Sequence, residues 1–76
     1  MELSEFVQQI AEQFDEIEQS EMTPNTEFKT LDEWSSLTAL SIIAMVDENY
    51  NVILNAEDIR NANTIEDLFE TVKRKI

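Results

Sequence analysis

Residues 34–50 read W-S-S-L-T-A-L-S-I-I-A-M-V-D-E-N-Y, and this stretch decides the fold. No charged residue occurs from position 34 through position 46, although 29% of the chain is charged. Acidic pairs stand at both ends of the run, at positions 32–33 and 47–48. Apolar residues recur within it at spacings of three and four, which predicts a helix over residues 35–50.

Helical periodicity places the apolar side chains of this helix in two stripes. The stripe expected to line the core comprises Ala39, Ile42, Ile43, Val46 and Tyr50. The other stripe comprises Leu37, Leu40 and Ala44. One stripe is enough to join a core, so the second is expected to meet a partner. An apolar strip rimmed by acid is typical of a docking surface.

The composition excludes several kinds of chemistry. The 76 residues suit one domain with a single modest core, spanning residues 1–76. The chain has no Cys, so it can form no disulfide, zinc-thiolate site or thiol nucleophile of its own. It also has no His, which removes the usual general base and the commonest metal ligand. An enzyme is therefore poorly supported, and we expect none.

Seventeen acidic residues against five basic ones give the chain a net charge of -12. Such a field repels nucleic acid and anionic membranes and attracts proteins with Lys and Arg patches, although it also serves solubility. No apolar run reaches transmembrane length and no signal-peptide pattern begins the chain, so we expect a cytoplasmic monomer without stable membrane association.

The remaining segments also favour helices. Apolar residues at helical spacing predict a helix over about 3–18, followed by a long loop over 19–34 that Phe28 and Leu31 attach to the core. A short helix over about 55–60 is expected, with Asn55 as its cap and Ile59 as its anchor. A final helix over 64–75 begins with a capping box and ends in cations. The fold class is all-α, with three main helices and one short one.

Two adjacent hydroxyls stand where the central helix begins. Ser35 or Ser36 can cap it by accepting a hydrogen bond from a backbone N–H of the first turn. A serine at this place also suits a phosphate ester, because free N–H groups and the helix dipole favour an anion. Simple capping is the alternative, since helices that begin with Ser are common.

The order of these features resembles the acyl carrier protein family over nearly the whole chain. An acidic helix and a long loop lead to S-S-L at positions 35–37, and the apolar helix that follows ends in D-E-N-Y. The short helix and T-I-E-D-L-F-E-T-V come next. The resemblance implies a four-helix carrier with 4'-phosphopantetheine esterified to Ser36, whose thiol holds acyl groups as thioesters. It implies as partners a phosphopantetheinyl transferase and acyl-handling enzymes with basic docking patches. The implied partner-binding residues are Ser35, Leu37, Leu40, Ser41, Ala44, Asp47 and Glu48.

The chain departs from the family pattern near the serine. Where the family has an Asp before the attachment serine, this chain has Ser35. Thr38 and Ser41 stand at positions of the following helix that are usually acidic in the family. The family's Gly is missing, and Trp34, which we expect to pack on the bundle, occupies this approach. These changes favour a dedicated fatty-acid or polyketide-type system. A peptidyl or aminoacyl carrier, or an unmodified acidic helical interaction module, is the alternative.

A calcium site is a weaker hypothesis. Six residues fall on positions 1, 3, 5, 7, 9 and 12 of an EF-hand loop, which supply the calcium ligands: Asp47, Asn49, Asn51, Ile53, Asn55 and Asp58. However, Val52 stands where the turn requires Gly, and position 12 is Asp instead of the bidentate Glu. We therefore expect no metal site, beyond weak cation binding by clustered carboxylates.

Overall fold

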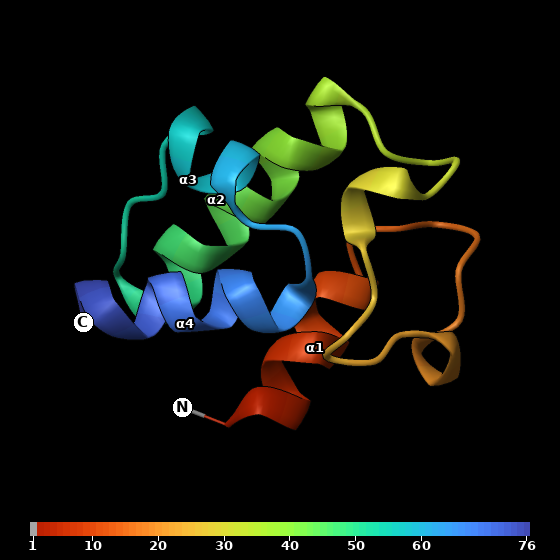
Figure 1. Cartoon of the computed structure of the whole chain (residues 1–76), viewed down its shortest axis with the longest axis horizontal. Coiled ribbons are helices and arrows are strands. Elements are labelled where there is room, and N and C mark those ends of the chain that lie inside the picture. Colours follow the sequence, from red (N-terminus) through yellow and green to blue (C-terminus); the bar gives the residue numbers. More distant parts are fainter. Residues whose placement is uncertain (1) are drawn as a thin grey trace.

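The computed structural model describes residues 2–76, without the side chain of Gln19. Over that part of the chain the backbone forms helices and no strand, which confirms the all-α fold (Figure 1). The elements are α1 (Leu3–Ala11), the short 3-10 helices η1 (Gln19–Glu21) and η2 (Phe28–Thr30), α2 (Ser36–Tyr50), α3 (Ala56–Asn61) and α4 (Ile65–Lys75). None of the described helices has the length and apolar character needed to span a bilayer.

The core lies where α4 packs against α1 and α3 (Figure 1). Phe6 of α1 is fully buried, and its ring meets that of Phe69 of α4 edge-on, with the centroids 5.5 Å apart. The fully buried large side chains come from every main helix and from the loop: Phe6, Ile10, Phe28, Ile42, Val46, Ile65, Leu68 and Val72. Phe28 attaches the loop to the core as the sequence predicts, and Leu31 packs half-buried beside it.

The first helix is shorter than its apolar pattern predicts, because α1 ends at Ala11 and not near residue 18. The chain then turns: the N–H groups of Gln13 and Phe14 bond to carbonyls three residues earlier, and Phe14 is brought into the core. Acidic residues without a basic neighbour follow, and such residues oppose the dipole of a continuing helix. Phe14 therefore belongs to the core without belonging to the helix, and the connection to α2 begins at residue 12.

The core-facing side of α2 is rotated relative to the predicted stripe. Ile42 and Val46 are fully buried as expected, and Met45, which the pattern missed, is also buried. The other predicted members are only half-buried, namely Ala39, Ile43 and Tyr50. Met45 lines the same hollow as Glu12 and Gln13, so the first residues after α1 lie beside that side of α2.

The later helices begin and end within one residue of the predicted bounds. Asn51 ends α2 in the left-handed conformation, with φ of 60°, in a chain that has no Gly. Asn55 caps α3 in a reciprocal box with Asp58. Thr64 and Asp67 form the same arrangement at the start of α4. These side chains satisfy N–H groups that have no partner inside a helix.

The long connection between α1 and α2 is fastened to the start of α4. The N–H of Ile65 donates to the carbonyl of Thr26 at 3.1 Å, and that of Glu66 donates to the carbonyl of Pro24 at 2.9 Å. These bonds hold η2, and the loop that delivers the chain to α2, against the helical bundle.

Candidate functional site

The two serines at the start of α2 have different surroundings. Ser35 has extended backbone, and its Oγ accepts a hydrogen bond from the N–H of Thr38 at 3.3 Å. Thr38 in turn donates from Oγ1 to the carbonyl of Glu33 at 3.0 Å. Ser36 is the first residue of the helix, is exposed, and takes no part in these bonds. Ser35 is therefore the cap, which leaves the Ser36 hydroxyl accessible.

The carboxylate of Glu33 fixes the approach to this serine pair. One carboxylate oxygen accepts the N–H of Asp15 and the other accepts the N–H of Glu16, both at 3.0 Å. These two amides follow the turn that ends α1, so Glu33 joins the beginning of the long connection to its end. The apolar spacing does not reveal this role, because it predicts that residues 15 and 16 are helical.

A groove of about 400 Å³ opens beside Ser36. Its lining residues come from α2 and α3, and from the connection that precedes α2. The lining residues are Lys29, Trp34, Ser36, Ala39, Leu40, Ile43, Ala56, Ile59 and Arg60. Trp34 packs edge-on against Phe28, with ring centroids 5.3 Å apart, which confirms that it packs on the bundle.

Two basic side chains line this otherwise mainly apolar groove. Lys29 of η2 donates from Nζ to the carbonyl of Arg60 in the last turn of α3, at 2.7 Å. Neither residue is among the site residues expected from the sequence. Their separation by 31 positions hides the contact. A signal was nevertheless available, because they are the only basic residues before the C-terminal Lys73-Arg74-Lys75 run.

The second apolar stripe of α2 is exposed, as the sequence predicts. Leu37 and Leu40 are 74% and 61% exposed, and Ala44 is also exposed. Ser41 between them is half-buried. Ser35 at one end and Asp47 and Glu48 at the other are exposed, so most of the predicted partner-binding residues reach the surface. Ile53, 74% exposed in the connection to α3, is an apolar surface residue that the stripe analysis did not include.

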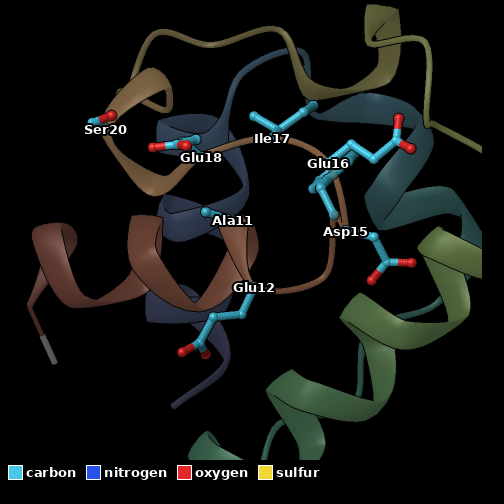
Figure 2. A pocket seen from close by; sticks show the side chains of 8 residues that line it. Ala11, Glu12, Asp15, Glu16, Ile17, Glu18 and Ser20 are labelled. Carbon is cyan, nitrogen blue, oxygen red and sulfur yellow. The ribbon is translucent and has the colours of Figure 1, made fainter.

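The acidic hollow next to α1 has a different character. Figure 2 shows the carboxylates of Glu12, Asp15, Glu16 and Glu18 pointing in different directions, so they do not converge on one point. Among residues 2–76 no group of three or more His, Cys, Asp or Glu residues is arranged to hold a metal ion. In the candidate EF-hand loop, Asp58 instead bonds to the N–H of Asn55 and pairs with Lys75.

Comparison with known families identifies this arrangement. Residues 5–72 match the family described as the phosphopantetheine attachment site. The chain belongs to this family of carrier domains. Its members bear a covalently attached 4'-phosphopantetheine, and they generally carry intermediates without catalysing reactions themselves. Neither the comparison with curated proteins nor that with solved structures gave a match.

The residues around the start of α2 suit such a prosthetic group. The exposed Ser36 hydroxyl provides an oxygen for a phosphate ester, and the adjoining N–H groups of the helix favour an anion there. The apolar walls of the groove suit the uncharged part of the arm. When bound, the group supplies the thiol that a chain without Cys lacks.

Proposed function

We propose that Ser36 is the attachment residue and that the chain carries acyl groups as thioesters for a dedicated fatty-acid or polyketide-type biosynthetic system. The observation that carries this proposal is the exposed Ser36 hydroxyl at the first position of α2, in a chain of the phosphopantetheine family. The neighbouring Ser35 is engaged as the helix cap, which favours Ser36 over it.

The attachment is a transfer from coenzyme A by a phosphopantetheinyl transferase. The Ser36 oxygen forms a bond to the phosphorus of the phosphopantetheine half, the bond to the departing 3',5'-ADP breaks, and the serine proton passes to a base of the transferase. The carrier contributes position: its helix start presents the hydroxyl to solvent and supports the resulting phosphodiester.

The exposed strip of Leu37, Leu40 and Ala44 is the proposed docking surface for the transferase and for acyl-handling enzymes. Asp47 and Glu48 at its far end, in a chain of net charge -12, suit basic patches on those enzymes. The departures at Ser35, Thr38 and Ser41 make this face less acidic than is usual in the family, which supports a dedicated set of partners. We place the carrier in the cytoplasm as a monomer.

Mass spectrometry tests the attachment residue. The protein is incubated with coenzyme A and a broad-specificity phosphopantetheinyl transferase. Wild-type protein and Ser35→Ala should gain the mass of one phosphopantetheine, while Ser36→Ala should gain nothing. Modification of Ser36→Ala, or failure of several transferases to modify folded wild-type protein, would contradict the proposal. The second failure would favour the unmodified interaction module.

The docking surface is tested with a pair of matched substitutions. Leu40→Glu should slow modification by the transferase about tenfold or more, because it places a charge in the centre of an apolar contact. The control is Ile76→Glu, which changes another exposed apolar residue, 72% exposed against 61% for Leu40, outside the strip. Circular dichroism should show that both variants remain folded. Equal rates for the two variants would remove the strip from the docking surface.

A further inference from the structure

Thr38, in the first turn of α2, bonds to the residues that precede the helix. Its hydroxyl donates from Oγ1 to the carbonyl of Glu33 at 3.0 Å, and its backbone N–H donates to Oγ of Ser35 at 3.3 Å. The hydroxyl oxygens of Ser35 and Thr38 lie 3.2 Å apart. Because the Thr38 hydroxyl proton is directed to the Glu33 carbonyl, Ser35 is the donor between the two hydroxyls. Ser35 and Thr38 therefore bond to each other in both directions.

The segment that Thr38 holds belongs to no helix. Residues 31–35 lie between the end of η2 and the start of α2. Within this segment Trp34 packs on Phe28, and the carboxylate of Glu33 bonds to the chain that follows α1. These contacts hold the segment to parts of the molecule other than α2. The hydroxyl of Thr38 joins it to α2 itself, because it reaches back five residues to the Glu33 carbonyl.

Ser36 lies between the residues that these bonds connect. It follows Ser35 and precedes Thr38, while its own hydroxyl is exposed and takes no part in the bonds. Thr38 is half-buried, whereas its neighbours Leu37 and Leu40 on the exposed strip are 74% and 61% exposed. The Thr38 hydroxyl is thus engaged with the preceding segment and not offered to a partner on the strip.

The hydrogen bond to the Glu33 carbonyl requires a donor at position 38. An ionised carboxylate, the group usual in the family at this position, accepts hydrogen bonds and donates none. Thr38 therefore does more than remove a charge from α2. It adds a bond that an acidic residue cannot make.

We propose that Thr38 is a positioning residue for attachment of the prosthetic group. By holding residues 33–35 against the first turn of α2, it fixes where the Ser36 hydroxyl is presented to the transferase. The attacking oxygen must be placed accurately against the phosphorus, and a misplacement of about 1 Å costs about a hundredfold in rate. Thr38 thus acts on the transfer step and not on docking. This inference rests on the proposed function, since it concerns modification of Ser36.

Single-turnover kinetics separate the transfer step from docking. Excess transferase modifies the carrier at saturating coenzyme A, and intact mass follows the product. The maximal rate reports transfer, and the transferase concentration at half the maximal rate reports docking. Thr38→Val keeps the shape and loses the hydroxyl, so it should lower the maximal rate about tenfold and change the half-saturating concentration by less than about twofold. Thr38→Ser keeps the hydroxyl and should restore most of the rate.

Two further variants make the comparison specific. Thr71 donates from Oγ1 to the carbonyl of Asp67 at 3.1 Å on α4, so Thr71→Val loses a bond of the same kind far along the chain and should match the wild-type rate. Thr38→Asp restores an acid and cannot donate, so its maximal rate should fall as in Thr38→Val. If Thr38 affected only the charge of the docking face, Thr38→Asp would instead be modified at least as fast as the wild-type protein. Circular dichroism verifies that every variant compared is folded.

The outcomes that overturn the inference are distinct. A wild-type maximal rate in Thr38→Val or in Thr38→Asp does so, and so does a change confined to the half-saturating concentration. Backbone order parameters from ¹⁵N relaxation supply a measurement without the transferase. They should fall at residues 34–36 in Thr38→Val and stay at wild-type values in Thr71→Val. Unchanged order at residues 34–36 overturns the inference even if modification slows.

Failure of the attachment itself is recognised separately. If folded wild-type protein gains no adduct at Ser36, the proposed function fails on the mass data and the inference fails with it. If the wild-type protein is modified at Ser36 and the Thr38 variants behave as it does, the inference fails alone.

Discussion

At the start of α4 the carboxylate of Asp67 accepts hydrogen bonds from the N–H groups of Asn63 and Thr64, both at 3.1 Å. The backbone bond from Thr64, followed by that from Asn63, lowers the pKa of Asp67 below its ordinary value of 3.8. The unfolded chain lacks these bonds, so the ionised form of Asp67 stabilises the fold. That stabilisation is complete above pH 3.8 and is lost as the pH falls through the lower folded-state pKa.

Asp67→Asn tests this residue. The variant should melt below the wild-type protein at neutral pH, and the gap should close as the pH falls below 3.8, where the wild-type carboxylate becomes protonated. Melting followed by circular dichroism across the acid range measures the gap. Glu66→Gln, which removes another carboxylate of the same turn, is the control for the change of charge. A gap that stays constant into strong acid would contradict the role of the ionised carboxylate.

The pKa of Tyr50, at the end of α2, is shifted in the opposite direction. Burial, followed by the charge of Glu5, raises the pKa of Tyr50, while its hydrogen bond to Gln9 opposes the shift. The neutral phenol therefore stabilises the fold, and this contribution is lost only as the pH rises through the folded-state pKa of Tyr50. At physiological pH the contact between α2 and α1 does not titrate.

Among the helices, the bounds of α3 and α4 could be predicted because capping residues mark them in the sequence. The end of α1 has no such mark and could not be predicted. The starts of α3 and α4 are specified by local hydrogen bonds between residues 55 and 58 and between residues 64 and 67. Both partners of each bond lie within a short window of the sequence, so these starts could be predicted. The segment after α1 has instead a distant partner, because Glu33 accepts the N–H groups of residues 15 and 16. Apolar spacing continued past the true end because Phe14 and Ile17 still pack on the core.

The candidate site also has a part that could be predicted from the sequence and a part that could not. The serine pair and the exposed stripe follow from helical periodicity and capping, so both could be located from the sequence. Lys29 and Arg60 are visible in the sequence as the only basic residues before the C-terminal run, but their meeting beside α2 could not be predicted, because it depends on how η2 and α3 pack. The bond between Lys29 and the Arg60 carbonyl is a product of tertiary packing.

Glu33→Ala tests the link between the two ends of the long connection. Losing both hydrogen bonds should lower the free energy of unfolding by about 1–2 kcal/mol. It should also speed hydrogen exchange at the Asp15 and Glu16 amides relative to the core amides. Glu27→Ala removes a carboxylate that caps no backbone N–H at η2, and serves as the control for the change of charge. Unchanged exchange at residues 15 and 16 would show that the Glu33 carboxylate does not protect these amides.

For the whole molecule, charge is the dominant feature. A net charge of -12 is confined to a body with principal extents of 29 × 24 × 20 Å. Carboxylates on all sides lie within a few Debye lengths of one another, since that length is about 8 Å at physiological ionic strength. Their mutual repulsion opposes the compact state, and the buried core must outweigh it.

Salt should therefore raise the melting temperature. Adding sodium chloride from low ionic strength to about 0.15 M should raise it by several degrees, because screening weakens the repulsion between carboxylates. Potassium chloride should act equally at the same ionic strength. Micromolar calcium chloride is the informative comparison. A shift at that concentration would mean specific binding instead of screening, and would revive the EF-hand hypothesis.

Helix capping and the proposed attachment of the prosthetic group use different residues, Ser35 and Ser36. The hydrogen bond from the N–H of Thr38 to Ser35 does not use the Ser36 oxygen, so esterification of Ser36 removes no partner from it. On the proposed attachment, loading and removal of the prosthetic group leave the helix start intact.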